Sequence, residues 1–177
     1  MDLATMMVNL ANEITGPAWK LLWVVSALCG TAYFGHIVGK MMRASQFPGQ
    51  RSLTLGDVGI VAIIAACMVN LSQLINVTWN SFGAGTVSYG PISYSGAASF
   101  GVFAAAINAV LTLVSISGGY FFFRGALLWR RAAVAGDSSH GTDDVAWRAS
   151  THMLGGAALV QITDMIERLR STLGLVW

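Results

Sequence analysis

The chain has 177 residues, of which 55% are hydrophobic and only 10% are charged. A soluble domain carries roughly 25% charged residues, so a soluble fold of this composition could not cover its own surface with polar groups. The net charge of +2 is too small for nucleic-acid binding by bulk attraction. The composition therefore excludes an ordinary soluble domain and requires lipid, or further copies of the chain, against the apolar surface.

Three apolar runs follow along the chain, at about residues 18–39, 58–79 and 99–123. Each has the length of roughly 20 residues that crosses ~30 Å of hydrocarbon, and lipid favours helices because it cannot satisfy an open backbone. Gly16-Pro17 is expected to begin the first helix, since proline is tolerated at a helix start. The first twelve residues contain no Lys or Arg, so no cleavable signal peptide is expected. We predict one all-α domain over residues 1–177, of the membrane type, with three to four long apolar helices.

The fourth segment, from Thr142 to about Leu173, permits two interpretations. Thr142 can cap a helix, but the apolar centre at residues 153–162 is too short to span a membrane unaided. The segment is either an amphipathic helix at the membrane interface or a fourth span shielded by its neighbours. We expect one long helix packed along the others, with its Gly155-Gly156 face turned inward.

The two halves of the chain show a weak internal repeat. Arg43 lies ten residues after Tyr33 at the end of the first run, and Arg130 lies ten residues after Tyr120 at the end of the third. An Asp-Val pair stands fourteen residues beyond each arginine. The repeated unit would be helix, basic loop, helix, over residues 18–79 and 99–173, which gives two tandem hairpins. The alternative is that an aromatic-then-basic end is common to any span that ends at the cytoplasm.

Basic residues gather after the first and third runs. They are Lys40, Arg43, Arg51, Arg124, Arg130 and Arg131. By the positive-inside rule both regions face the cytoplasm at insertion, and topology is a sufficient explanation of their charge. The functional alternative is a surface that binds anionic lipid head groups, or the backbone of a passing nucleic acid, at about 1 kcal/mol per cation.

Polar and small residues inside the apolar runs predict close packing between helices. They are Asn70, Gln73, Asn108, Thr112, Gly118, Gly119, Gly155 and Gly156. The favoured role of the polar side chains is hydrogen bonding between helices, worth about 0.6–2 kcal/mol per contact, and the alternative is a polar pathway for ions or solute. The glycines would allow helix backbones to approach one another.

No recognisable catalytic pattern occurs in the sequence. It has no nucleophile–base arrangement, no Gly-rich phosphate loop and no Cys-x-x-Cys pair. Cys29 and Cys67 lie inside apolar runs, where cysteine behaves as a small hydrophobic residue. We expect no enzymatic activity, no metal and no cofactor apart from bound phospholipid.

Two segments, from Ser117 to Arg130 and from Trp147 to Ala157, resemble the TraQ family of I-type (IncI) conjugative plasmids. That family is related to the IcmC/DotE-like membrane proteins of type IVB secretion systems. The resemblance implies a place in the bacterial inner membrane and a part in conjugative DNA transfer, and it supplies no catalytic residues. A looser similarity links the chain to conjugative pilins, which are helical hairpins with a basic loop that leave the inner membrane for a filament that contains lipid. The chain departs from that pattern because it would hold two such hairpins.

Three functions follow as expectations. The first is a pilin-like structural subunit that assembles with phospholipid into a pilus or conduit, with the six basic residues facing the lumen or lipid head groups. The second is an inner-membrane scaffold of the same complex that never enters a filament. The third is a small transporter or channel, which is the weakest because it needs an ionisable residue at mid-membrane depth and His36 lies near the end of its run. Expected partners are further copies of the chain in a helical filament, membrane lipid, other secretion-system proteins, and single-stranded DNA only as passing cargo.

Overall fold

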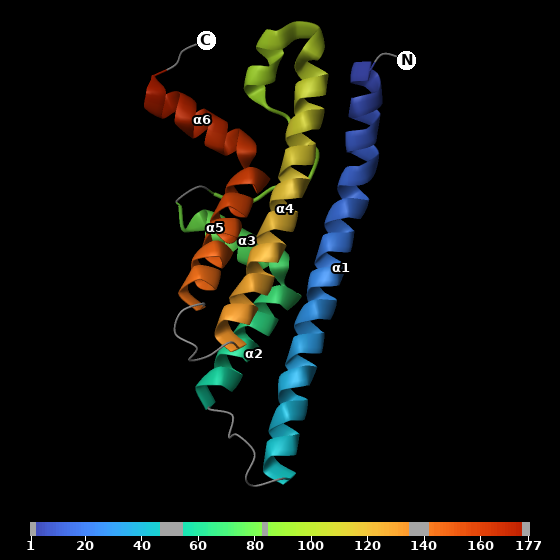
Figure 1. Ribbon diagram of the computed structural model, residues 1–177. Coiled ribbons are helices and arrows are strands. Elements are labelled where there is room, and N and C mark those ends of the chain that lie inside the picture. Colours follow the sequence, from blue (N-terminus) through green and yellow to red (C-terminus); the bar gives the residue numbers. More distant parts are fainter. Residues whose placement is uncertain (1–2, 47–54, 83–84, 135–141, 175–177) are drawn as a thin grey trace.

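The computed structural model describes residues 3–46, 55–82, 85–134 and 142–174, which contain helices and no strand. In chain order the elements are α1 (Leu3–Gln46), α2 (Leu55–Val69), α3 (Leu71–Asn80), the 3-10 helix η1 (Ser95–Phe103), α4 (Ala104–Val134), α5 (Thr142–Val160) and α6 (Ile162–Leu173) (Figure 1). Among the described residues, α1 and the η1–α4 segment are long and apolar enough to cross a membrane, and the bent pair α2–α3 is a third candidate if it counts as one span. The all-α fold of the membrane type is confirmed.

The helices form two hairpins that lie side by side. α2 returns antiparallel along α1, and α5 returns antiparallel along α4, while α1 and α4 run in the same direction (Figure 1). The C-terminal ends of α1 and α4, which carry Arg43 and Arg131 in their last turns, therefore point toward the same end of the molecule. This is the arrangement that the distribution of basic residues predicts.

Helix α1 is longer than the first apolar run, and the prediction that Pro17 begins it is wrong. Pro17 lies inside the helix and is exposed, whereas Thr15 and Trp19 on either side of it are 2% exposed. Proline removes one backbone hydrogen bond from a helix interior. Because the turns before and after it bury one face, packing holds the helix together through that defect.

The second apolar run is not one straight helix, since α2 and α3 meet at an angle of 97°. Asn70 sits at the break with φ −120° and ψ 62°, and its side-chain oxygen accepts hydrogen bonds from Gln73 N at 3.4 Å and Ser72 Oγ at 3.2 Å. A side-chain acceptor of this kind caps the start of a new helix. The polar residue inside the run therefore marks a bend.

The prediction of one long helix from Thr142 to Leu173 is also wrong. Gln161 interrupts it with φ −109° and ψ 46°, and α6 turns away from α5 (Figure 1). No residue of α6 is fully buried, and its polar face includes Asp164 in the first turn and Arg170 in the last. The amphipathic interpretation thus fits α6, while α5 packs along α4 as a separate short helix.

The two hairpins share one pattern of contacts. Ser26 in α1 donates its hydroxyl to the carbonyl oxygen of Met68 at 2.6 Å, just before the α2–α3 break. Ser115 in α4 donates in the same way to the carbonyl oxygen of Val160 at 2.8 Å, just before the α5–α6 break. A helix that ends leaves carbonyl groups without partners, and a serine from the other helix of the hairpin satisfies one of them in each case.

A single apolar core joins the hairpins. Its buried members come from α1, α2, α3, α4 and α5: Trp19, Met68, Leu71, Ile75, Phe122, Phe123, Ala126, Ala157 and Val160. Because all four hairpin helices contribute, this core fixes how one hairpin lies against the other.

Candidate functional site

The predicted basic residues lie in two groups at the loop ends of the hairpins. Lys40 and Arg43 are exposed near the end of α1, and Arg124 and Arg131 are exposed on α4. Arg51 lies outside the described residues. The four exposed side chains place cations where anionic groups of lipid could reach them.

Arg130 differs from the expectation that it faces a lumen or lipid head groups. Its guanidinium carbon lies 3.6 Å from the centroid of the Tyr33 ring, so the side chain joins α4 to α1. Arg130 is half-buried, and its Nε atom is buried without a hydrogen-bond partner in the described part of the chain. The ring face provides the favourable contact for this cation, since aromatic rings carry negative charge on their faces.

We expect Tyr33→Ala to lower the free energy of unfolding by about 0.5–2 kcal/mol, because it removes the ring on which Arg130 stacks. Tyr33→Phe keeps a ring and should retain most of that stability. Thermal unfolding in detergent, followed by circular dichroism, measures both changes. Phe34→Ala is the matched control, because the neighbouring Phe34 ring on the same helix is 52% exposed. Equal stability of Tyr33→Ala and the unmodified chain would show that the stack contributes nothing.

Polar side chains from two helices hold a loop between α3 and η1, residues 85–94, which we call the tied loop. Each of three side-chain oxygens accepts one backbone N–H group of this loop. The pairs are Asn76 Oδ1 with Val87 N at 3.1 Å, Thr112 Oγ1 with Ile92 N at 3.0 Å, and Asn108 Oδ1 with Tyr94 N at 3.0 Å. Loop backbone has no helical partner for these groups, so side chains must supply the acceptors where water is excluded.

The tied loop is fixed further by an aromatic side chain of its own. Tyr89 packs edge-on against Trp19 at 4.9 Å and Trp23 at 5.5 Å between ring centroids, and its hydroxyl donates to the carbonyl oxygen of Ser72 at 2.7 Å. Burial raises the pKa of the Tyr89 phenol above its ordinary value, which keeps the hydroxyl protonated as a donor. Gln161, at the α5–α6 break, donates from Nε2 to the carbonyl oxygen of Thr86 at 3.2 Å.

The prediction that four polar residues bond one helix to another is therefore wrong in detail. Asn108 and Thr112 bind the tied loop, Asn70 caps α3, and Gln73 is exposed. Within each hairpin, a bond between helices comes instead from a serine whose acceptor carbonyl lies beside a helix break, and Ser95 of η1 donates to Glu167 of α6. Ser115 follows Asn108 and Thr112 at helical spacing in the third apolar run, whereas nothing in the apolar run around Ser26 distinguishes that serine.

Three of the four predicted packing glycines lie at close contacts. A Cβ atom added to Gly156 would lie 2.6 Å from Phe122 N and 2.7 Å from Gly118 O, and one added to Gly118 would lie 2.7 Å from Val160 N. A Cβ at Gly119 would meet the Trp19 ring at 2.6 Å. The first two glycines let α4 and α5 approach, and the third lets α1 approach α4.

The prediction for Gly155 is wrong. It is exposed, and no atom lies within 4 Å of an added Cβ. One residue turns an α-helix by about 100°, so neighbouring glycines cannot both face the same partner helix. Gly30 and Gly125, which the sequence analysis did not single out, have close contacts with α2 and α5 respectively.

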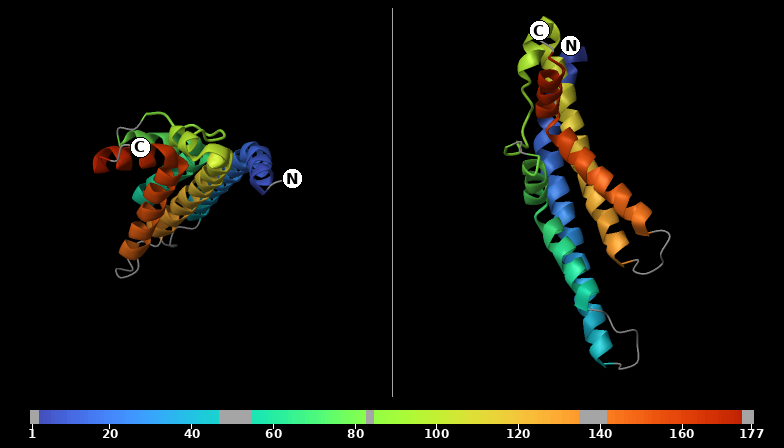
Figure 2. Two further views of the ribbon diagram at one scale, coloured as in Figure 1. Left: turned by 90° about the horizontal axis from the view of Figure 1, so that it is seen from above. Right: turned by 90° about the vertical axis from the view of Figure 1, so that its left-hand side faces the viewer.

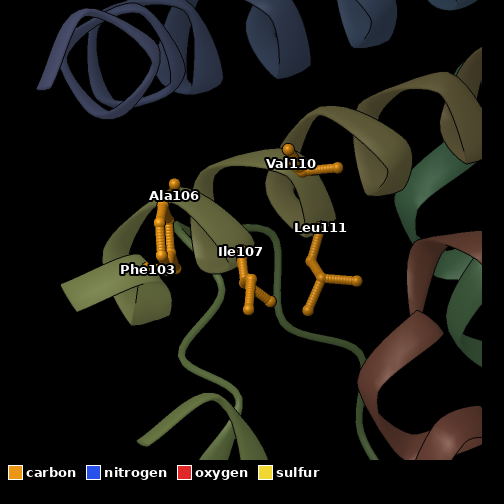
Figure 3. A pocket seen from close by; sticks show the side chains of 5 residues that line it. All are labelled: Phe103, Ala106, Ile107, Val110 and Leu111. Carbon is orange, nitrogen blue, oxygen red and sulfur yellow. The ribbon is translucent and has the colours of Figure 1, made fainter. Parts of the chain in front are cut away.

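The end of η1 and the first turns of α4 carry an open apolar depression of about 260 Å³ (Figure 3). It is lined by Phe103, Ala106, Ile107, Val110 and Leu111. Small-molecule sites usually add a few placed polar groups to such a surface, and this lining has no polar side chain. The depression therefore suits an acyl chain or an apolar protein segment.

The candidate functional features of the described residues are thus the exposed cations, the tied loop and the apolar outer faces of the helices. No group of three or more His, Cys, Asp and Glu side chains in the described part of the chain could hold a metal ion. Comparisons of the chain with protein-family models, with curated proteins and with solved structures find no match.

Proposed function

We propose that the chain is a pilin-like structural subunit of a conjugative DNA-transfer apparatus of the type IVB secretion class, which assembles with phospholipid into a pilus or conduit. The observation that carries this proposal is the pair of tandem helical hairpins, whose basic ends point the same way and whose outer faces are apolar. A hairpin with this pattern is the unit of conjugative pilins. The resemblance of the chain to the TraQ family, which covers most of its length, favours the same setting.

The outer apolar surface requires a cover. Exposed large hydrophobic side chains occur along α1, η1 and α4, among them Leu21, Leu28, Phe34, Met42, Val102, Phe103 and Tyr120. Monomeric soluble proteins rarely expose contiguous apolar patches of more than a few hundred Å². Lipid covers these faces in the inner membrane, and neighbouring copies cover them in a filament.

The exposed cations explain why phospholipid belongs in the assembly. Lys40, Arg43, Arg124 and Arg131 would recur in every copy along a filament. Left bare on a lumen wall, such repeated cations would hold DNA through its phosphates and slow its passage. Anionic head groups bound to them neutralise the wall, so that single-stranded DNA passes as cargo without being retained.

Reversal of two of these charges tests the proposal that the cations bind anionic lipid. Lys40→Glu with Arg131→Glu is expected to lower the affinity for anionic lipid roughly a thousandfold, at about 1 kcal/mol for each of the four charge units changed. Filament yield and DNA transfer should fall with it, while the subunit remains in the membrane fraction. Lys40→Arg with Arg131→Lys is the matched control, because it keeps both charges and should keep both filament yield and DNA transfer.

Sheared extracellular filaments, analysed by electron microscopy and by mass spectrometry of protein and lipid, separate the possible outcomes. Filaments that lack this chain would contradict the subunit proposal and favour an inner-membrane scaffold. Filaments that contain the chain without phospholipid would support the subunit role and contradict the proposal that lipid belongs to the assembly. Unchanged DNA transfer by the double Glu variant would contradict the proposed role of the cations.

A further inference from the structure

We propose that copies of the chain join head to tail, with Arg43 of one copy stacked on Tyr120 of the next, as Arg130 is stacked on Tyr33 within the chain. The inference deepens the proposed function, because it names the partner of the subunit and the register of their contact. It rests on contacts between the two hairpins and requires no property of DNA.

Each hairpin has one Tyr and one Arg at matching positions, and the stacking contact within the chain involves only one residue of each pair. Tyr33 belongs to the first hairpin and Arg130 to the second, and they meet at 3.6 Å. Their counterparts are Tyr120 and Arg43, because the same ten-residue spacing separates Tyr from Arg in each half. The Tyr120 ring is 54% exposed, and Arg43 is exposed. Each copy therefore carries an open ring at the second hairpin and an exposed cation at the first.

A second contact between the hairpins also has equivalent residues in the other half of the chain that lie on open surface. Gly119 packs against Trp19 and Leu22, at 2.6 Å between an added Cβ and the Trp19 ring. With the same offset, Ala32 corresponds to Gly119 and Ala106 to Trp19. Ala32 is exposed on α1, and Ala106 lines the open depression on α4 (Figure 3). At this position a small residue of one copy again faces an uncovered apolar surface of the next.

These contacts also show that the second hairpin is displaced along the first. α1 and α4 run in the same direction, and Arg130 lies beside Tyr33. Tyr120 stands ten residues earlier in α4, so it lies about 15 Å along the helix axis from Tyr33, at 1.5 Å per residue. The contact of Gly119 with Trp19 gives a similar displacement. Figure 2 agrees, since the loop ends of the two hairpins lie at different heights.

A displacement of this kind determines the type of assembly. Repetition of one head-to-tail contact closes into a ring only if the operation is a pure rotation, and it builds an open helix if the operation includes a translation. Each hairpin adds the same shift, so each further copy lies higher than the last. Such a series leaves the plane of a flat bilayer and extends as a filament.

Cysteine crosslinking in whole cells tests the contact. In a background with Cys29→Ala and Cys67→Ala, chains with Arg43→Cys and chains with Tyr120→Cys are co-expressed and treated with a short bismaleimide. The mixture is expected to give dimers, a chain with both substitutions is expected to give a ladder of dimers, trimers and larger species, and neither single variant alone should link. A second pair, Ala32→Cys with Ala106→Cys, asks the same question with the Arg43 and Tyr120 side chains intact.

The matching contact within the chain is the positive control. A chain with Tyr33→Cys and Arg130→Cys should give linked peptides from the monomer band, which shows that the reagent reaches this distance. If that control links while neither mixed pair gives dimers, the proposed contact is wrong. Dimers from a single variant would indicate symmetric pairing and would also overturn it.

The crosslinks separate this inference from the proposed function. A ladder from cells that produce no filament containing this chain would support the contact and contradict the pilin-like role. Filaments that contain the chain, with no ladder from either pair, would keep the role and contradict the contact.

Discussion

Gly156→Ala is expected to destabilise the packing of α4 on α5, whereas Gly155→Ala at the adjacent position is expected to leave it intact. The new Cβ at Gly156 would lie 2.6 Å from Phe122 N and 2.7 Å from Gly118 O, which are backbone atoms and cannot move as a flexible side chain can. Overpacking of this kind costs about 1–3 kcal/mol of unfolding free energy. At Gly155 the same methyl group meets open space, and the higher helix propensity of alanine adds up to about 1 kcal/mol.

Thermal unfolding of the two variants in the same detergent, followed by circular dichroism, measures the difference. The variants differ only in which of two adjacent residues gains one methyl group, so their general effects on the chain are matched. Equal unfolding temperatures would contradict the α4–α5 contact at Gly156. A lower temperature for Gly155→Ala than for Gly156→Ala would show that α5 is rotated from the orientation described.

The combined change Asn108→Leu and Thr112→Val is expected to release the tied loop from α4. The N–H groups of Tyr94 and Ile92 would lose their acceptors, and a buried group left without a partner costs about 1–3 kcal/mol. Opening of the loop restores those hydrogen bonds to water. We expect the exchange of both amides to quicken by roughly 10- to 100-fold, which corresponds to that free energy.

Hydrogen–deuterium exchange with peptide-level mass spectrometry, in nanodiscs, reports on the loop directly. Ser117→Ala is the control on the same helix, since the exposed Ser117 hydroxyl donates only to Leu113 O one turn earlier. Fast exchange confined to residues 85–94 is the expected result. Unchanged exchange at Ile92 and Tyr94 would mean that the remaining contacts, with Asn76, Gln161 and the ring of Tyr89, hold the loop without α4.

The long helices and their membrane type could be predicted because both depend on run length and composition alone. The breaks could not be predicted in this way. Asn70 and Gln161 are single polar residues within apolar segments, and such residues also occur in unbroken helices. What permits the breaks is distant in sequence, since Ser26 and Ser115 supply donors to carbonyl groups beside them. Pro17 is the converse case, where burial on both sides maintains a helix that the local sequence would interrupt.

The sequence allowed the residues of the candidate site to be predicted from their types, but it did not allow the residues that they contact to be predicted. Asn108 and Thr112 stood out as polar residues in an apolar run, but their partners lie in a loop whose path depends on the whole bundle. Arg130 carried the same charge signal as Arg131, and only the position of α1 brings Tyr33 to it. Gly155 and Gly156 were equivalent in sequence, and the rotation of α5 decides which of them meets α4.

The length of α1 has a further consequence for where the subunit is stable. Its 44 residues rise about 66 Å, whereas the hydrocarbon of a bilayer is ~30 Å thick, and even a tilt of 40° leaves the helix about 50 Å tall. Exposed apolar side chains occur near both ends, Leu3 and Met6 at one and Met41 and Met42 at the other, so one bilayer cannot cover both ends at once. Hydrophobic mismatch costs fractions of a kcal/mol per Å. Protein neighbours remove that mismatch without thickening a membrane, so the length of α1 favours protein neighbours over a bilayer alone, in agreement with the proposed filament.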